Sequence, residues 1–397
     1  MAHFSRSISE TFSNRLHLLS VAPQVLREPP AQHRGVEDPS LNNTCYPSRN
    51  SIGLRHRGFL AAVRTWLKEL KAAPLLSSQL GMHQIATATS KYTDGDIAVV
   101  VPVRNERKFL GSFLTHYRKL GVARFIVIDD QSCDGTVEYL TAQNDVDLWR
   151  STVRYADAQR SILWREWIFN HYGQNRWYLN LDVDEYLVYQ DCYQRPITDV
   201  AAHLSIQQHF RMAAPMIDLY PGEHSCANLS DDVPPWEIAN QFDATGYVIG
   251  QASSGWSIKG GLRGRKFGLS NQLIKYPLTY WDSESSLSRG IHKPRPFKRN
   301  FGPIYGVLLH FKFFSDLKQK VDTAIEDCQY FSNAAEYQLI AKVLAETPEL
   351  QLHDVQYSAG YEGPGQLIGL GFMRELWMII VAFMGFASTF QFLLDGI

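Results

Sequence analysis

The sequence lacks several features that mark common classes of protein. Its five cysteines are odd in number, scattered over 397 residues, and without the spacing of a zinc site. We therefore expect free thiols in a reducing compartment, which favours a cytoplasmic location. The 39 basic and 40 acidic residues nearly cancel, so bulk charge gives no reason to expect a nucleic-acid partner.

The first 90 residues lack a long apolar run and are rich in proline, serine and asparagine. They carry ten lysines and arginines against five acidic residues, and no apolar segment typical of a secretory signal is present. Such a composition predicts a basic, largely disordered extension over residues 1–90. The main domain is then expected over residues 91–345.

The end of the chain has the opposite character. Residues 376–394 carry no charged side chain, and nineteen residues are enough to span a bilayer. Ser388, Thr389 and Gln391 fit a buried packing helix equally well, so a membrane partner and a packing helix both remain open for the C-terminal region, 346–397. In either case we expect the central sheet to fold without residues beyond about 365.

Residues 96–182 alternate between apolar runs and amphipathic stretches with short connections. This pattern predicts an α/β fold: a mainly parallel, Rossmann-like sheet with helices on both faces, followed by C-terminal helices. Later segments are less regular, and residues 221–260 are expected to be loops. The expected strands are Asp96–Val103, Ala123–Asp130, Val146–Thr152, Arg176–Asp182, Phe210–Tyr220, Gln272–Trp281 and Ile304–Phe314.

Polar side chains follow three of these strands, in Pro102–Glu106, Asp129–Thr136 and Asp182–Glu185. Ligands bind at the carboxyl ends of strands in parallel sheets, so the three segments predict one site. Asp182 and Asp184 would repel each other unless a cation lay between them. Oxygen ligands suit Mg²⁺ or Mn²⁺, which commonly also bind a diphosphate. The alternative is a solvated acidic turn that caps the next helix.

Several motifs together resemble a known family. "VVPVRNE", "FIVIDDQSCDGT" and "WYLNLDVDEYLVY", followed by "GLRGRKFG", "LIKYPLTYW" and "GVLLHFKFFSD", are similar to family 2 glycosyltransferases of the GT-A fold. The similarity is to the bacterial branch with an Asp-x-Asp-Glu motif, and it covers about residues 94–345. It implies metal-dependent transfer of a sugar from a nucleotide-diphosphate sugar, with a UDP-sugar expected, to a hydroxyl of a glycan or a lipid-linked acceptor.

The resemblance also implies roles for individual residues. Pro102 would lie beside the base, with Asp130 or Asp129 as its hydrogen-bond acceptor. Asp182 would lie near the ribose and metal, Asp184 would bind the metal directly, and His310 would add a further ligand. Arg263 and Arg265, on a glycine-rich segment expected to be a flexible loop, would stabilise the diphosphate. The base that deprotonates the acceptor stays open among Asp282, Glu284 and Glu185.

Three other interpretations remain. An aspartate-dependent phosphohydrolase also uses an Asp-x-Asp pair after an apolar strand, but places it earlier in the chain. A nucleotidyltransferase would usually have a glycine-rich phosphate loop after the first strand, which "PVRNERK" lacks. An inactive membrane-associated scaffold is disfavoured because the predicted ligands are present.

Overall fold

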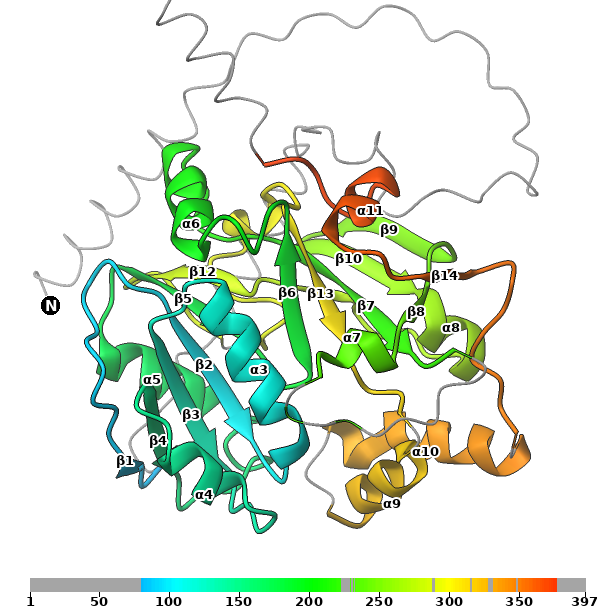
Figure 1. Cartoon of the computed structure of the whole chain (residues 1–397), viewed down its shortest axis with the longest axis horizontal. Coiled ribbons are helices and arrows are strands. Elements are labelled where there is room, and N and C mark those ends of the chain that lie inside the picture. The colour runs from blue at the N-terminus through cyan, green and yellow to red at the C-terminus, as the bar shows by residue number, and fades with distance from the viewer. Residues whose placement is uncertain are drawn as a thin grey trace, which may run out of the picture. The chain divides into compact units, whose positions relative to one another are not determined.

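The computed structural model describes residues 80–376 except 223–228, 230, 232, 288–289, 315, 328–330 and 348 (Figure 1). Most of the predicted extension 1–90 and nearly all of the apolar segment 376–394 therefore lie outside the described residues. Among the residues described, no helix is long and apolar enough to cross a membrane. Cys133 and Cys192, the cysteines in the described ranges, are free thiols.

A six-stranded sheet contains the predicted βα units in the order β1-β4-β3-β2-β5-β12 (Figure 1). Its four central strands are parallel, and the two edge strands β1 and β12 run antiparallel to their neighbours. The predicted mainly parallel sheet is thus confirmed. The strands are β1 (His83–Ala86), β2 (Ala98–Val103), β3 (Arg124–Asp129), β4 (Val146–Arg150), β5 (Arg176–Asn180) and β12 (Leu278–Trp281).

Helices cover both faces of this sheet because successive side chains of a strand point to opposite sides. Val99 and Val101 of β2 pack in the core that contains α3 (Arg107–Lys119). Val100, between them, packs on the other side with α5 (Ile162–Tyr172). Two short helices, α4 (Thr136–Thr141) and α6 (Ile197–Ile206), complete this part of the chain.

A second sheet follows in the order β14-β8-β7-β13-β6 and is mostly antiparallel. Among the described strands of this sheet, the one parallel pairing joins β7 and β13, which places His310 beside Asp218. The short strand β11 pairs with β7. The strands are β6 (Glu185–Tyr189), β7 (Ala214–Tyr220), β8 (Gln241–Asp243), β11 (Ile274–Lys275), β13 (Gly306–His310) and β14 (Ser358–Gly360).

The loop prediction for residues 221–260 is wrong, because part of this segment forms a two-stranded hairpin of β9 (Tyr247–Ala252) and β10 (Gly255–Gly260). Most side chains of β9 are exposed, so the hairpin needs little apolar sequence. The segment "GLRGRKFG" is likewise no flexible loop. It forms the helix α8 (Gly261–Phe267) and ends at Gly268, whose φ of 62° suits glycine.

Three helices near the end of the chain confirm the predicted C-terminal helices: α9 (Leu317–Asp327), α10 (Phe331–Glu346) and α11 (Pro364–Gly369). Leu317 and Val321 of α9 pack with Leu262 of α8 in a separate apolar cluster. In Figure 1, α9 and α10 lie beyond the carboxyl end of β2 and below the second sheet.

Two of the expected boundaries need correction. β1, inside the predicted extension 1–90, pairs with β4 and forms an edge of the first sheet. At the other end, β14 pairs with β8, and Leu367, Phe372 and Leu376 are buried in the main core. Residues 364–376 therefore belong to the fold, and a sheet without residues beyond 365 would lose core side chains.

Candidate functional site

The predicted acid cluster lies where the chain leaves the first sheet and enters the second. We call residues 182–185 the acid turn; it follows β5 and ends at the start of β6. The N–H of Leu181 donates to Val100 O in the first sheet (3.2 Å), and the N–H of Phe311 donates to Asp184 O beside the second (2.9 Å). Both sheets therefore fix the turn.

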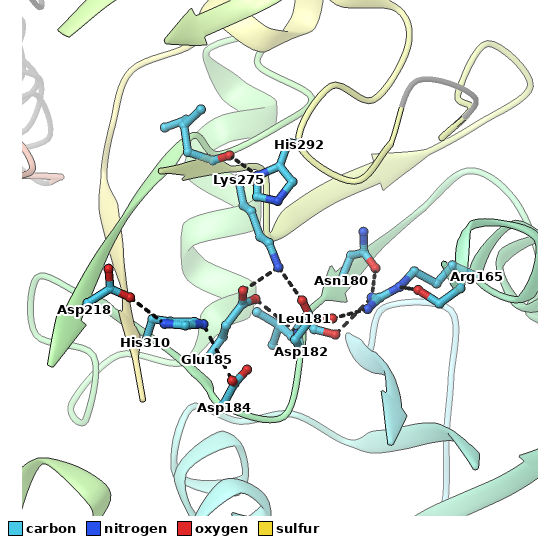
Figure 2. A network of polar contacts seen from close by, with 12 residues as sticks. Arg165, Asn180, Leu181, Asp182, Asp184, Glu185, Asp218, Lys275, His292 and His310 are labelled. Carbon is cyan, nitrogen blue, oxygen red and sulfur yellow. Dashed lines mark hydrogen bonds and ion pairs between the residues drawn. The ribbon is translucent and has the colours of Figure 1, made fainter. Parts of the chain in front are cut away.

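Two carboxylates of the turn, Asp182 and Glu185, are bound by cationic side chains of the protein (Figure 2). Arg165 Nη2 donates to Asp182 Oδ1, and Lys275 Nζ donates to Asp182 Oδ2, both at 2.5 Å. Lys275 also donates to Glu185 Oε1, while the N–H of Asp182 donates to Glu185 Oε2 (3.1 Å). We call these four residues the paired side of the site.

The ammonium group of Lys275 thus lies between two carboxylates, as the predicted cation would. Burial alone would raise the pKa of Asp182, but the charges of Lys275 and Arg165 hold it below its usual range. Burial of Lys275 would lower its pKa, and the two carboxylates raise it above its ordinary value instead. Lys275 is therefore charged, and the repulsion expected between the acids is offset by protein side chains.

Asp184, the third carboxylate, differs. No hydrogen bond to its side chain is present within the described ranges, and its Oδ2 lies 3.6 Å from His310 Nε2. The other ring nitrogen, His310 Nδ1, lies 2.7 Å from Asp218 Oδ1 (Figure 2). We call Asp184, His310 and Asp218 the open side of the site. It brings together two residues that were predicted to bind a metal.

Further charged groups surround the open side. Lys312, Lys320 and Arg263 each interact electrostatically with Asp184. Glu106, at the end of the motif after β2, also interacts with Asp184, and its Oε2 is buried without a hydrogen-bond partner among the residues described. Burial raises the pKa of Glu106 to about 7. The motif after β2 therefore adds a carboxylate to this edge.

The residues predicted to bind the base lie at the carboxyl end of β3, next to arginines. Arg150 Nε donates to Asp129 Oδ2, and Arg154 Nε donates to Asp130 Oδ1, both at 2.9 Å. Burial raises the pKa of Asp130 despite the charge of Arg154. Pro102 lies one residue before the end of β2 and is half-buried. These positions are compatible with the predicted pocket, and base recognition stays a prediction.

The two arginines predicted to act on the diphosphate have partners within the fold. Arg263 donates from Nε and Nη2 to Asp218, and Arg265 donates from the same two atoms to Asp243. Arg263 is buried and lies on the helix α8, so the flexible loop expected for this segment is not what the structure contains. Arg263 lies beside the open side, where its Nη2 contacts Asp218 and also lies 3.1 Å from His310 Nδ1 and 3.4 Å from His310 Nε2. Arg265 is directed to β8.

Asp282 and Glu284, two candidates for the base, lie at the other end of the first sheet. β12 runs antiparallel to β5, so that Trp281 pairs with Arg176, the first residue of β5. Both carboxylates bind Arg299 and line a surface cavity of about 650 Å³. The structure therefore does not bring them to the acid turn, because the strand before them runs in the opposite direction from β5. Glu185 is near, but its oxygens are hydrogen-bonded as described above.

Three residues of the paired and open sides were not identified from the sequence: Arg165, Asp218 and Lys275. One signal was available for Lys275, since a single lysine interrupts the apolar run "QLIKYPLTYW" and a buried lysine requires a partner. Asp218 similarly interrupts the apolar strand "APMIDLY". Arg165 gave no signal, because arginines are common on amphipathic helices.

The donor set can be tested against the predicted cation. No group of three or more histidine, cysteine or acidic side chains in the described part of the chain is arranged to hold a metal ion. Mg²⁺, however, is commonly held by one or two carboxylates together with substrate phosphates and water. Asp184 and His310 fit such a site with two protein ligands. Asp182, with a cationic donor on each oxygen, does not fit the role of a direct ligand.

Comparisons with known proteins give little further guidance. No family model and no curated protein match the chain. Among solved structures, UDP-glucose pyrophosphorylase from Acinetobacter baumanii is 9% identical and has a TM-score of 0.26, with 64% of this chain and 83% of that chain covered. A structure from Bacillus anthracis described as a glucose-1-phosphate thymidylyltransferase is 11% identical and has a TM-score of 0.28, with 60% of this chain and 98% of that chain covered. TM-scores this low support no conclusion about the activity of this chain.

Proposed function

We propose that the protein is a metal-dependent glycosyltransferase that uses a nucleotide-diphosphate sugar. The main support is the arrangement of the open side, where the carboxylate of Asp184 and the imidazole of His310 face each other at the junction of two sheets. Further support is the order of the sequence motifs, which place one segment with polar side chains at the end of each of β2, β3 and β5. A UDP-sugar remains the expected donor.

Each part of the site has a role in this proposal. Asp130 accepts a hydrogen bond from the base, and the sugar diphosphate extends from there toward the acid turn. Asp184 and His310 hold Mg²⁺ or Mn²⁺ on the diphosphate. Such a cation, when bound, stabilises the negative charge that develops on the leaving diphosphate. Lys312 and Lys320, which interact electrostatically with Asp184, lie where they add to this stabilisation.

Asp182 and Glu185 have a different role: they fix the shape of the acid turn through Lys275. This arrangement supports the turn without using the carboxylate of Asp184. The acceptor is a hydroxyl of a glycan or of a lipid-linked glycan. The proposal assigns no base to it, because Asp282 and Glu284 lie at the other end of the sheet and both oxygens of Glu185 are hydrogen-bonded.

The test is a reaction screen with the full-length protein. UDP-, GDP- and dTDP-sugars are incubated with Mn²⁺ or Mg²⁺, with and without excess chelator, and the products are identified. Release of a nucleoside diphosphate that stops with chelator, and that Asp184→Asn abolishes, is the expected result. Nucleotidyl transfer would instead convert the sugar nucleotide and pyrophosphate to a nucleoside triphosphate and a sugar phosphate. A phosphohydrolase would release inorganic phosphate from a phosphomonoester. Either product without nucleoside diphosphate release would overturn the proposal.

A further inference from the structure

The carboxyl edge of the first sheet holds a further cluster of charges, beside the residues predicted to bind the base. Arg104 follows β2, Arg154 follows β4, and both contact Asp130. Arg104 Nη1 donates to the backbone O of Asp130 (2.8 Å), and Arg154 Nε donates to its Oδ1 (2.9 Å). Longer contacts reach Asp130 Oδ2, at 3.9 Å from Arg104 Nη1 and 3.5 Å from Arg154 Nη2. Asp130 is buried, so it fixes both arginines at the ends of the strands.

Both arginines also contact one acid from a distant part of the chain. This acid is Asp327, the last residue of α9, a helix that lies beyond the carboxyl end of β2 (Figure 1). Arg104 Nε lies 3.2 Å from Asp327 Oδ2, and Arg104 Nη2 donates to Asp327 Oδ1 (3.3 Å). Arg154 Nη2 lies 3.7 Å from the same Oδ1. Two guanidinium groups from two strand ends thus converge on one carboxylate.

The contacts with Asp327 are looser than those with Asp130. The shortest contacts of the two arginines are 2.8 and 2.9 Å with Asp130, but 3.2 and 3.7 Å with Asp327. The side chain of Asp327 is 24% exposed, against 4% for Asp130. A partly exposed ion pair changes an equilibrium constant by about fivefold or less. Asp327 is therefore the partner that a ligand can replace.

The chemistry of the two arginines suits a phosphate group. A guanidinium binds the oxygens of a carboxylate and of a phosphate in the same two-point geometry, and a phosphate group offers more charge and more acceptor oxygens than a carboxylate. The side chains of Arg104 and Arg154 are 32% and 27% exposed, so a ligand can reach them from solvent. Asp130 is the predicted acceptor of the base, so a phosphate on these arginines belongs to the same nucleotide.

We infer that Arg104 and Arg154 form a phosphate-binding site, which Asp327 of α9 occupies as an internal substitute for the ligand. A phosphate group of the nucleotide then binds by displacing the carboxylate of Asp327. This inference deepens the proposed function and rests on it for the identity of the ligand. It adds two residues that bind the nucleotide and one helix that competes with it.

Asp327→Asn tests the inference because it removes the competing charge with almost no change in volume. Asp322→Asn is the matched control, since Asp322 is exposed on the same helix and has no ion pair within the described part of the chain. Titration calorimetry on the full-length protein, without metal, measures the affinities for inorganic pyrophosphate and for uridine. Pyrophosphate carries charge without a base, and uridine carries a base without charge.

Pyrophosphate should bind Asp327→Asn about 5–20-fold more tightly than the wild type, because two partly exposed ion pairs no longer compete with it. In Asp322→Asn its affinity should stay within about twofold, because solvent and salt screen an exposed charge. The affinity for uridine should be the same in all three proteins. The double variant Asp327→Asn/Arg104→Gln should bind pyrophosphate no more tightly than the wild type.

Four results would overturn the inference. They are an unchanged pyrophosphate affinity, or no binding at all, in a folded Asp327→Asn; an equal gain in Asp322→Asn; an equal gain for uridine; and a gain that persists without Arg104. The single variants Arg104→Gln and Arg154→Gln test the site even if Asp327→Asn does not fold. Each should weaken pyrophosphate binding, and an unchanged affinity in both would also overturn the inference.

Failure of the proposed function is a separate result. Pyrophosphate contains neither a sugar nor a base, so its affinities do not depend on the reaction that the protein catalyses. If they change as expected but no sugar nucleotide releases a nucleoside diphosphate, the phosphate-binding site stands and the proposed function fails.

Discussion

The paired and open sides of the site each contain one aspartate of the acid turn, and the two aspartates differ in how they are bound. On the paired side, both oxygens of Asp182 receive a donor from a cationic side chain, and Glu185 shares the same lysine. On the open side, Asp184 is two residues away from Asp182, and its carboxylate lacks a hydrogen bond to any described residue. Adjacent acids in one turn therefore serve different purposes.

The difference shows that a cluster of acids does not by itself indicate how many of them bind a metal. The cation between Asp182 and Glu185 is Lys275, whose position in the chain is 90 residues beyond Glu185. A fixed cation of this kind allows the turn to hold its shape before any ligand arrives. The carboxylate that remains without such a partner is the one available to a ligand.

The largest expected effect is on the paired side. Lys275→Met leaves Asp182 and Glu185 close together without their shared cation, and removing one partner of a buried ion pair costs about 3–5 kcal/mol. Urea unfolding, followed by circular dichroism, measures the loss. Lys298→Met is the control, because Lys298 is exposed and its ion pair with Glu284 is worth less than about 1 kcal/mol. Equal stability of the two variants would mean that the ion pairs of Lys275 do not stabilise the fold.

The second prediction concerns acid. Burial lowers the pKa of His292, beside Lys275, to about 4, and that of His116, in the main core, also to about 4. Both folded values lie below the unfolded value of about 6.5, so the unfolded chain binds more protons between these limits. The stability is therefore complete above pH 6.5 and falls as the pH is lowered to 4, by up to about 3 kcal/mol for each histidine.

Chemical unfolding at a series of pH values tests this dependence. His292→Gln should remove part of the decrease between pH 6.5 and pH 4, because glutamine does not titrate. If the stability of the variant falls as steeply as that of the wild type, His292 is not held neutral in the folded protein. His116 would remain as an independent source of the same dependence.

A smaller effect is expected at the end of β3. Asp130→Ala removes the predicted acceptor of the base and should weaken nucleotide binding by about 1–3 kcal/mol. Titration calorimetry with UDP measures this loss. Asp129→Ala is the comparison, since Asp129 instead accepts from Arg150 and from the N–H of Ser132. Unchanged affinity in Asp130→Ala, with a loss in Asp129→Ala, would assign the role to Asp129.

The smallest effect is expected far from the site. Asp282→Asn and Glu284→Gln should each leave the rate of nucleoside diphosphate release within about twofold of the wild type, under 1 kcal/mol in activation free energy. We expect so small an effect because both residues lie at the amino-terminal end of β5, and the acid turn lies at its other end. A loss of orders of magnitude in either variant, with the fold intact, would show that the acceptor is bound from that end of the sheet.

Much of the first sheet could be predicted from the sequence because its strands are local apolar runs. β2, β3 and β5 are buried on both faces, and such runs are visible without any knowledge of their partners. The hairpin β9–β10 could not be predicted in this way. β9 is largely exposed and both strands contain glycine, so their pairing with each other replaces the apolar signal.

The site could be predicted where its residues are adjacent in the chain. The clustering of acids predicts Asp182 and Asp184 as site residues, and the family resemblance adds His310. The structure brings Asp184 and His310 to 3.6 Å from each other, and their roles stay predictions. The sequence did not identify Arg165 and Lys275, the cationic side chains that bind Asp182 and leave Asp184 free of such a partner among the residues described. Arg165 lies 17 residues from Asp182, and Lys275 lies 93 residues from it, so only folding brings these charges together. Asp282 and Glu284 were misplaced because the direction of β12 could not be deduced from its composition.

The most direct test of the division between the two sides is the Mn²⁺ affinity of Asp182→Asn and Asp184→Asn, measured side by side with the wild type. Both substitutions remove one carboxylate charge from the same turn. Asp184→Asn should weaken Mn²⁺ binding by more than about 100-fold, beyond the loss typical of outer partners. Asp182→Asn should remain within about threefold, a difference of under 1 kcal/mol. Equal losses in the two variants would contradict the assignment of Asp184 alone as the carboxylate ligand.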